Sequence, residues 1–546
     1  MPGAARVAAI DLGASSGRVM MVTVGPGVLE LEEVHRFRLY PEPHQVDGSA
    51  YLLWNFQYLL AQVTEGLAKA AGQGPVDAIG VDSWGADFGF IDASGQLLGP
   101  VVAYRDDRTE GVEPWVWDRA ARPAAPDSGQ ALYGLTGAAH QRFNTVFQLA
   151  AEVLGRSPMP GRLEQADKLL MLPDLVAHHL TGAAFAEVTA ASTSGLFDPW
   201  RRSWCWPLID ALGLPQGLFP QVVEPGTVVG GLRADLAERL GLAAETPVVA
   251  VGGHDTASAV AAVPALAPAG APDEGQFAYI SCGTWSLVGV ELPAPVATAA
   301  AREANFTNEL GLDGTVRFLK NVSGLWLLNE CQRAWAAQGL EADTRVLLDQ
   351  AAALPAGPAF NADDPAFIAP GGMPARVGSA SAAAGRAASA TNNGDQPNPS
   401  GFSQAELTRA IIDSLAASYA RAVRQAETIT GLAVSRLHVV GGGSNNRLLC
   451  RAAATALPGV EVLAGPGEAT ALGNALAVAR GIGAVGGSLA DLRRLIADRF
   501  PPTLCLPEPP PPGAGPEIYP GTSPDGLLRY PATAGQTPIV TKESLP

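Results

Sequence analysis

The sequence predicts an α/β protein made of two copies of one structural plan, with a cleft between the copies. Near the N-terminus, "AAIDLGASSGRVMMVTV" contains an apolar strand, a short turn of small residues and a second strand. The same order returns in "FAYISCGTWSLVGVEL", which begins at Phe277. Further strands and helices follow each hairpin, so the repeat extends beyond the turn itself.

In the first half, apolar and β-branched runs predict strands over residues 7–10, 18–24 and 31–39. Residues 54–71 carry apolar side chains at helical spacing and are expected to form a helix. Residues 79–82 are typical of a buried strand, and the run "FGFI" that follows "DSWGAD" is expected to be its neighbour.

In the second half, "VRFLKNVSG" predicts a strand and "LWLLNECQRAWAA" a helix. Ser403 and Glu406 form a capping box that opens a helix running to Gly431. "RLHVVGGGSNNRLLCRAAATAL" then predicts a strand, a glycine turn and a helix. "VEVLAG" and "EATALGNALAVARG" predict one more strand and helix.

Two segments lie outside this plan. Residues 375–400 are rich in Ala, Gly, Ser and Asn and are expected to form a long surface loop. Residues 491–546 form a tail in which "PEPPPPGAGP" favours extended or disordered chain. At 546 residues the chain is too long for one ordinary hydrophobic core, which agrees with two large domains.

Composition excludes several classes of partner. The net charge of −17 disfavours nucleic acid and anionic membrane as partners. No apolar run is long enough to span a bilayer, and the N-terminus lacks a signal-peptide pattern. The five cysteines form no C-x-x-C pair, so we expect neither a metal nor a disulfide framework. These features predict a protein of the reducing cytoplasm.

The turn at residues 13–17 supports more than one chemistry. It matches the G-x-S-x-G pattern of a serine hydrolase elbow with Ser15 as nucleophile, but an elbow needs a helix next, and the strand-like "RVMMVTV" follows. Small residues instead let backbone N–H groups and the Ser15 and Ser16 hydroxyls face a phosphate. An ordinary hairpin turn does not explain Asp11 at the end of a buried strand, where a carboxylate is costly unless it meets a metal or its water.

A second candidate site lies in "VVAVGGHDTASAVAAV". The chain has no G-x-x-x-x-G-K-[ST] motif, and no G-x-G-x-x-G opens a helix after the first strand, so any nucleotide needs another loop design. Asp255 follows an apolar strand and two glycines and precedes a helix of small residues. Asp255 alone can be a helix N-cap and His254 alone is more often structural, but together with the glycines they favour a site.

Three further motifs carry weaker signals. "SCGTWS" repeats the polar hairpin turn, so two turns in matching positions can hold a polyphosphate from both sides. "VVGGGSNN" suits close approach of a flat or anionic ligand, or tight packing alone. "DSWGADF" combines Trp84 with Asp87, which suits sugar binding, although Trp84 can equally belong to the core.

Taken in order, these motifs resemble those of the FGGY carbohydrate kinases, which have the actin/hexokinase-like ATPase fold. The match runs from about Arg6 to Gly483 and includes "AYRDDRT", "FNTVFQL", "LLMLPDLVAHHLTG", "ANFTNE" and "AGPGEATALGNA" besides the motifs above. "LGASSGR", "SWGADF" and "LKNVSGLW" favour the branch of the family that phosphorylates L-rhamnulose. The resemblance implies two duplicated ribonuclease H-like, actin-like ATPase domains, at residues 1–246 and 247–490, with the active site in the cleft between them.

The resemblance also implies the roles of individual residues. Asp255 is the catalytic base, and Asp11 lies near Mg²⁺, which it contacts through water. The residues implied to line the sugar site are Gly85, His254, Asp255, Thr256 and Asn321. The residues implied to bind ATP are Ala14, Ser15, Ser16, Gly17, Arg18, Thr284 and Gly442, together with Asn329, which stands one methylene shorter where the family usually has Gln.

The implied reaction is ATP- and Mg²⁺-dependent phosphorylation of the 1-hydroxyl of L-rhamnulose, giving L-rhamnulose 1-phosphate in L-rhamnose catabolism. Asp255 would accept the hydroxyl proton. A free Asp, with a pKa of about 3.9, is a weak base at neutral pH, and this suffices when phosphoryl transfer is loose and proton loss is late. One alternative is a kinase for another ketose or polyol, such as L-fuculose or D-xylulose. Another is a non-catalytic sugar-binding regulator on the same fold, which the presence of both hairpins, Asp11 and Asp255 disfavours.

Overall fold

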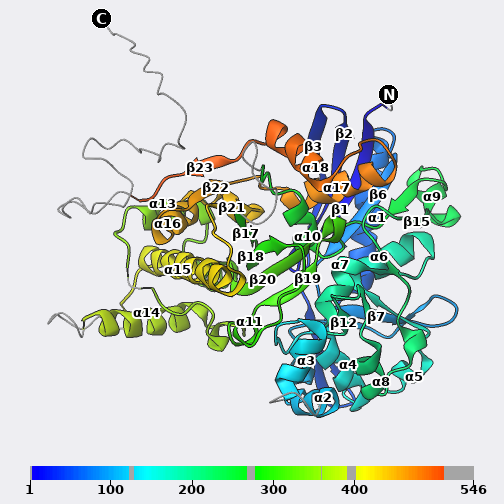
Figure 1. Cartoon of the computed structure of the whole chain (residues 1–546), viewed down its shortest axis with the longest axis horizontal. Coiled ribbons are helices and arrows are strands. Elements are labelled where there is room, and N and C mark those ends of the chain that lie inside the picture. The colour runs from blue at the N-terminus through cyan, green and yellow to red at the C-terminus, as the bar shows by residue number, and fades with distance from the viewer. Residues whose placement is uncertain are drawn as a thin grey trace, which may run out of the picture.

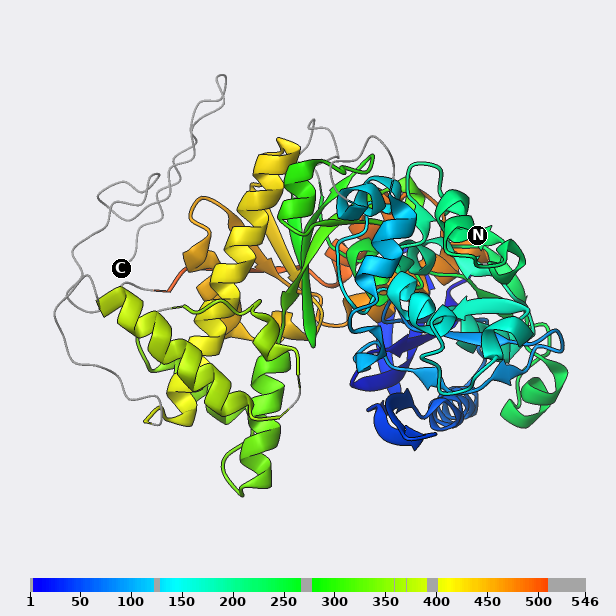
Figure 2. The same ribbon diagram turned by 90° about the horizontal axis from the view of Figure 1, so that it is seen from below.

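The computed structural model describes residues 3–121, 128–266, 277–357, 359–369, 371–389 and 401–508. The chain forms two lobes that lie side by side, one from the N-terminal half and one from most of the C-terminal half (Figure 1, Figure 2). Each lobe is built around one large mixed β-sheet with helices packed against it. No helix within these described ranges is long and apolar enough to cross a membrane.

The first sheet has the strand order β15-β16-β6-β1-β2-β3. Its strands are β1 (Ala5–Leu12), β2 (Ser16–Gly25), β3 (Val28–Arg38), β6 (Ala78–Ser83), β15 (Val228–Gly231) and β16 (Pro247–Val249). β1 is antiparallel to β2, its hairpin partner, and parallel to β6. Every residue of β6 is buried, as expected for a central strand whose two faces are both covered.

The second sheet repeats this core in the order β19-β20-β18-β17-β21-β22-β23. Its strands are β17 (Phe277–Cys282), β18 (Trp285–Leu292), β19 (Thr307–Leu310), β20 (Val316–Ser323), β21 (Arg436–Val440), β22 (Glu461–Ala464) and β23 (Thr503–Cys505). β17 is antiparallel to β18 and parallel to β21, as β1 is to β2 and β6. The predicted duplication of an α/β plan is therefore confirmed.

Two helices join the lobes. α10 (Asp255–Ala261) and α17 (Ala469–Gly481) pack against one another, and α17 also packs on β1 while α10 contacts β17 (Figure 1). The helices approach closely, because a Cβ on Gly473 would lie 1.8 Å from the Ser258 carbonyl oxygen. One continuous apolar core contains side chains of these helices and of both sheets.

Other helices cover the outer faces of the sheets. α1 (Phe56–Gly72) packs on β2 and β3, and α15 (Gln404–Thr430) runs across β18 and β20, as Figure 2 shows. The remaining helices are α2 (Glu113–Ala120), α3 (Ser128–Thr136), α4 (Thr145–Val153), α5 (Arg162–Gln165), α6 (Leu172–Thr181), α7 (Val188–Ala191), α8 (Trp206–Ala211), α9 (Ala234–Leu240), α11 (Ala299–Glu303), α12 (Trp326–Ala337), α13 (Thr344–Ala352), α14 (Met373–Ser389), α16 (Arg447–Ala456) and α18 (Leu489–Arg499). The small sheets pair β4 (Glu42–Val46), β5 (Ser49–Trp54) and β9 (Val101–Val102); β7 (Phe88–Ile91), β8 (Leu97–Leu98) and β10 (Lys168–Met171); β11 (Ala186–Glu187) and β14 (Val222–Val223); and β12 (Phe197–Asp198) and β13 (Ser203–Trp204).

Most predicted elements are present, and the predicted capping box of α15 is confirmed. Two placements were wrong. β7 does not pair with β6 but lies between β10 and β8 in a separate small sheet, because the chain turns away after the Trp84 loop. β16 pairs with β6, so the first sheet extends past the predicted boundary at residue 246.

The predicted surface loop at 375–400 was wrong over residues 375–389, which belong to helix α14. This segment is rich in Ala, the strongest helix former, and it buries Met373, Val377 and Ala382 against α12 and α15. The rest of that prediction, residues 390–400, lies outside the described residues.

The predicted disordered tail also begins too early. α18 starts with a capping box at Ser488 and Asp491, and β23 pairs with β22 at the edge of the second sheet. Glu508 then forms an ion pair with Arg409. Residues 509–546, which contain most of the proline-rich stretch, lie outside the described residues.

Candidate active site

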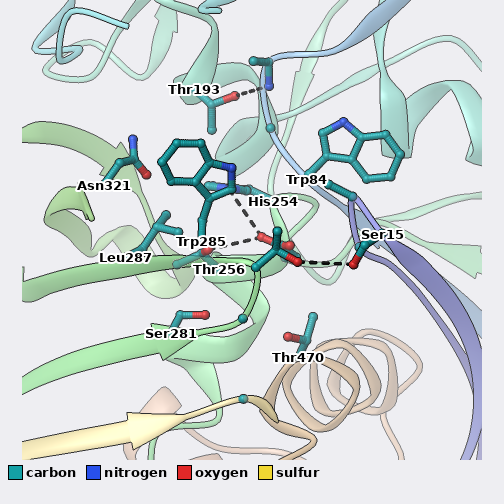
Figure 3. Close-up of a pocket in the computed structure, with 18 of the residues that line it drawn as sticks. Ser15, Trp84, Thr193, His254, Thr256, Ser281, Trp285, Leu287, Asn321 and Thr470 are labelled. Atoms are coloured by element: carbon teal, nitrogen blue, oxygen red, sulfur yellow. Dashed lines mark hydrogen bonds and ion pairs between the residues drawn. The ribbon is translucent and has the colours of Figure 1, made fainter. Parts of the chain in front are cut away.

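A cavity of about 330 Å³ lies between the lobes. Both hairpins contribute to its lining, as do the loops after β6 and β16, the glycine turn after β21 and the start of α17. Figure 3 shows Ser15 and Trp84 from the first lobe facing Trp285, Ser281 and Asn321 from the second. The sequence-predicted residues that line this cavity are Asp11, Ala14, Ser15, Ser16, Arg18, Gly85, His254, Asp255, Thr256, Thr284, Asn321 and Gly442.

The first hairpin carries the charge of the site. Asp11 is the cross-strand partner of Arg18, and their side chains form an ion pair at 2.5 Å. Arg18 also pairs with Glu468, which directly precedes α17. The Asp11 carboxylate and then Glu468 raise the pKa of Arg18, so the guanidinium stays charged at the cavity edge.

A second carboxylate lies beside Asp11 on the parallel strand β6. Asp82 is fully buried and accepts a hydrogen bond from Asn474 Nδ2 at 2.6 Å, while its Oδ1 atom has no partner. Burial, and then the nearby charge of Asp11, raise the pKa of Asp82 well above its ordinary value. An unpaired buried carboxylate oxygen is costly, which points to a missing cationic or hydrated partner at this end of the cavity.

The two hairpin turns meet across the cavity. The Ser15 Oγ and Thr284 Oγ1 atoms lie 3.2 Å apart, as the dashed line in Figure 3 marks. Each turn is closed by one backbone hydrogen bond, from Gly13 N to Ser16 O and from Gly283 N to Trp285 O. The serine hydrolase interpretation was wrong, because β2 and not a helix follows the first turn.

Gly17 does not line the cavity. A Cβ there would lie 2.2 Å from the ring of Phe37, so this glycine makes room for the neighbouring strand β3. Asn329 also lies away from the cavity, in the first turn of α12. Neither residue is therefore part of the lining of this cavity.

Asp255 lies at the base of the cavity between the hairpins. It is the first residue of α10, and the N-cap position belongs to His254, which makes no side-chain capping bond. The interpretation of Asp255 as an N-cap is therefore wrong. Burial raises the pKa of Asp255, His254 opposes the shift and Asp11 adds to it, so the carboxylate is a stronger base than a free Asp.

His254 connects Asp255 to the second lobe. Its Nε2 atom lies 3.4 Å from Asp255 Oδ1, and its Nδ1 atom lies 2.9 Å from Glu309 Oε2. The fully buried Arg317 approaches the same Glu309 oxygen at 3.0 Å. Burial raises the pKa of Glu309, but His254 and Arg317 outweigh it and hold this pKa below its ordinary value.

The end of the cavity near Trp84, Tyr104 and Trp285 is aromatic. A Cβ at Gly85 would lie 3.0 Å from Thr193 Oγ1, so the glycine lets this loop pack closely against Thr193 at the cavity wall. Trp84 lines the cavity, whereas Asp87 lies behind it and accepts hydrogen bonds from the Trp84 and Trp54 indole N–H groups at 2.8 and 2.7 Å. Burial raises the pKa of Asp87 to about 6. Asp87 thus orients Trp84 and does not itself face the cavity.

Aromatic side chains from both lobes meet at this end. The Trp285 indole N–H donates to the Tyr104 hydroxyl at 3.2 Å, and Phe143 packs against both rings. The Arg105 guanidinium lies over the Trp285 and Trp326 rings at 5.5 and 4.2 Å from their centres. This contact is hard to predict from sequence, because its members are scattered over more than 200 positions, from Tyr104 to Trp326.

The glycine turn after β21 packs directly on the second hairpin. Gly441 has a φ of +81°, which favours glycine, and a Cβ on Gly443 would lie 2.0 Å from Cys282 Sγ. Beyond this turn lies a second cavity of about 970 Å³, lined among others by Asn445, Arg447 and Glu468. Gly467 lines both cavities, so they adjoin.

Several site residues were not predicted, namely Asp82, Trp285, Glu309 and Glu468. For Asp82 and Glu468 the available signal was a carboxylate near the end of an apolar strand or directly before an apolar helix, where an ionised group needs a partner, whereas Glu309 lies in the polar stretch "TNEL" and gave no such signal. The motifs containing them were noted, but only the tertiary structure shows which charges meet.

The comparisons with known proteins agree with this architecture. Models of the N-terminal and C-terminal domains of the FGGY family of carbohydrate kinases match residues 7–262 and 278–482. A rhamnulokinase of Bacteroides thetaiotaomicron is 37% identical over 494 residues, covering 90% of this chain and 94% of the relative. A rhamnulokinase of Klebsiella pneumoniae is 40% identical over 471 residues, covering 85% and 87%.

Solved structures share the fold at low sequence identity. Ligand-bound xylulose kinase from Lactobacillus acidophilus has a TM-score of 0.70 at 14% identity, covering 92% of this chain and 94% of that one. Plasmodium falciparum glycerol kinase with ADP has a TM-score of 0.65 at 13% identity, covering 91% and 93%. The predicted fold class of two duplicated actin-like ATPase domains is thereby confirmed.

Proposed function

The chain belongs to the FGGY family of carbohydrate kinases, and we propose that it transfers the γ-phosphoryl group of ATP to the 1-hydroxyl of L-rhamnulose. The sugar is inferred from the rhamnulokinases that match 85–90% of this chain at 37–40% identity. The chemistry is supported by one observation above all, the Asp255 carboxylate, which is half-buried, has a raised pKa and lines the cavity between two polar hairpin turns.

In this proposal Asp255 accepts the proton of the attacking hydroxyl. The raised pKa of this carboxylate brings it nearer to neutral pH, where a general base is most effective. The sugar would lie between Gly85 and Asn321 against the aromatic end, with His254 and Thr256 beside the reacting hydroxyl. Phosphoryl transfer needs positioning and charge neutralisation more than a strong base, and the closed aromatic contact between the lobes keeps water away.

The nucleotide would extend from the hairpins into the second cavity. Backbone N–H groups of residues 14–16 and the hydroxyls of Ser15 and Thr284 would bind the transferred phosphate, and Arg18 supplies a fixed positive charge. The glycine turn at Gly442 separates this space from the 970 Å³ cavity, which has room for a nucleoside. Asn329 lies on neither cavity, so we do not assign it an ATP contact.

The residues present fit a magnesium ion held through water and nucleotide. Within the described ranges no group of three or more His, Cys, Asp or Glu side chains is arranged to hold a metal ion by itself. Mg²⁺ keeps several waters and binds through one or two carboxylates plus substrate phosphates, which suits Asp11 and the unpaired oxygen of Asp82. When bound, the ion would neutralise charge on the phosphates.

A coupled assay of ADP release tests the assignment. With ATP and Mg²⁺, L-rhamnulose should give the highest kcat/KM in a panel with L-fuculose, D-xylulose, L-ribulose and glycerol. A site that hydrogen-bonds each hydroxyl discriminates epimers strongly, because a misplaced hydroxyl leaves buried groups unpaired. Preference for another sugar would refute the substrate and retain the kinase, whereas binding without turnover of any sugar would support a non-catalytic regulator.

A further inference from the structure

The imidazole of His254 lies between two carboxylates from different parts of the chain. On the cavity side, Nε2 faces Asp255 Oδ1 at 3.4 Å. From the other side of the ring, Nδ1 faces Glu309 Oε2 at 2.9 Å, and the side chain of Glu309 is only 7% exposed although it also contributes to the cavity lining. The backbone N–H of His254 also donates to Thr189 Oγ1 at 3.2 Å, so both the ring and the main chain are fixed.

The contact with Glu309 determines where the ring carries its proton. A carboxylate oxygen only accepts hydrogen bonds, so Nδ1 at 2.9 Å must carry a hydrogen. Arg317 Nη1 lies farther from Nδ1, at 3.3 Å, and its stronger contact is with the Glu309 oxygen at 3.0 Å. With Nδ1 committed to Glu309, Nε2 is the nitrogen presented to Asp255 and to the cavity.

We propose that Glu309 is a positioning residue for the phosphoryl transfer, which accepts the Nδ1 proton of His254 and thereby holds Nε2 beside Asp255. Arg317 completes the arrangement by holding Glu309, and it is itself anchored by donation from Nε to the Leu310 carbonyl at 3.1 Å. Glu309 lies on β19 and Arg317 on β20, so the second sheet orients a residue of the loop that follows the first sheet. This inference rests on the proposed function, in which Asp255 receives the hydroxyl proton.

The substitution Glu309→Gln tests the role. Glutamine keeps the shape but cannot accept from both His254 and Arg317 without turning its NH₂ group toward one of these donors. We expect kcat to fall by about 10- to 100-fold, the usual effect of removing a carboxylate that orients a functional histidine, while KM for ATP stays within about twofold. In a His254→Ala background the same substitution should cost less than about threefold, because a residue that acts through His254 has nothing left to orient.

An equal loss of kcat in both backgrounds would overturn the proposal, since it would mean that Glu309 acts on the sugar or the fold directly. Stability needs a separate control, because Glu309→Gln leaves the buried Arg317 without its counter-charge. The double variant Glu309→Gln/Arg317→Met removes both charges. Its Tm should return toward that of the wild type while its kcat stays low. A return of kcat together with Tm would contradict a positioning role.

A matched ion pair between the second sheet and helix α18 provides the reference. Glu291 on β18 pairs with Arg493 at 2.8 Å, and both side chains are largely buried away from the cavity. Glu291→Gln should lower Tm and leave kcat within about twofold of the wild type, as expected of an interaction remote from the site.

The variant Asp255→Asn separates failure of this inference from failure of the proposed function. If Asp255→Asn keeps full turnover, the proposed function itself fails. If Asp255→Asn is inactive but Glu309→Gln lowers kcat by the same factor in the wild-type and His254→Ala backgrounds, only this inference fails.

Discussion

The two hairpins have the same backbone plan but opposite electrical character. In β1–β2 the second cross-strand pair from the turn is Asp11 with Arg18. In β17–β18 the corresponding pair is Ser281 with Leu287. The ion pair of the first hairpin is thus replaced by a hydroxyl and an apolar side chain in the second.

The neighbouring parallel strands extend this difference. Asp11 lies beside Asp82 of β6, whereas Ser281 lies beside Val440 of β21. Duplication has therefore kept the hairpin and the strand order, although the first turn has four residues between Leu12 and Gly17 and the second has three between Cys282 and Ser286, while the charge is gathered on one copy. The first hairpin suits a metal–phosphate group, and the second supplies neutral donors and the aromatic contact that closes the cavity.

The largest effect is expected at Asp255, which belongs to neither hairpin. Asp255→Asn keeps the side-chain shape but removes the proton acceptor, so kcat should fall by about 10²- to 10⁴-fold. ATP binding should survive, because both hairpins are unchanged. Turnover, Tm and binding of ATP and L-rhamnulose are measured together, and a folded variant with more than about a tenth of normal kcat would lie outside the range for a general base.

A matched control separates catalysis from helix capping. Asp343 is a true N-cap, whose side chain accepts from the Arg345 and Val346 N–H groups at the start of α13. Asp343→Asn should leave kcat unchanged, since Asn caps as well as Asp.

The pH profile of kcat provides a second test of Asp255 as the base. Because the pKa of Asp255 is raised, wild-type kcat should fall as pH drops through it, and this acid limb should be absent in Asp255→Asn.

The charge difference between the hairpins predicts the next effect. Asp11→Asn should lower kcat/KM by about 10- to 100-fold, the effect expected of a group that acts on a metal through water. A higher Mg²⁺ concentration should recover part of the loss. Ser281→Ala, at the matching position, should cost less than about tenfold, the worth of one hydrogen bond. Titration with Mg²⁺ at fixed ATP measures both. Equal losses would show that the two hairpins share the metal–phosphate charge.

These differences explain how much the sequence alone could predict. Both hairpins, the Asp255 loop and the glycine turn are local patterns of strand, small residues and turn. The sequence alone was therefore enough to locate them. Glu309 and Asp82 were missed as site residues because nothing local shows which charges meet, and only strand pairing brings Asp82 beside Asp11 and Glu309 beside Arg317. The helix α14 was missed because Ala, Gly and Ser suit both loop and helix, and packing against α12 and α15 decided the outcome.

The aromatic contact of the second hairpin predicts a smaller effect on the sugar. Trp285→Ala removes the hydrogen bond to Tyr104 and the contacts with Phe143 and Arg105. These are worth about 1–2 kcal/mol, so KM for the sugar should rise by about 5- to 30-fold with little change in KM for ATP. Trp285→Phe keeps an aromatic ring and loses the N–H donor, so its KM for the sugar should lie between those of the wild type and Trp285→Ala. A rise confined to KM for ATP would place this ring at the nucleotide instead.

The smallest effect is expected where the hairpins touch, at the hydroxyls of Ser15 and Thr284. If the first turn binds phosphate through its backbone, Ser15→Ala removes one hydroxyl contact and leaves the N–H groups in place. The loss should stay below about tenfold and appear in KM for ATP.

Thr284→Ser provides the matched control for Ser15→Ala, since it keeps the opposing hydroxyl and loses only a methyl group. In the double variant Ser15→Ala/Thr284→Ala, the combined loss should be less than the product of the single losses, because the two hydroxyls share one contact at 3.2 Å.

A fluorophosphonate probe should not label Ser15, whose neighbour across the cavity is a threonine and not a histidine. Abolished turnover in Ser15→Ala together with labelling of the wild type would make the first turn a nucleophile site. The resemblance between the two hairpins would then be one of backbone alone.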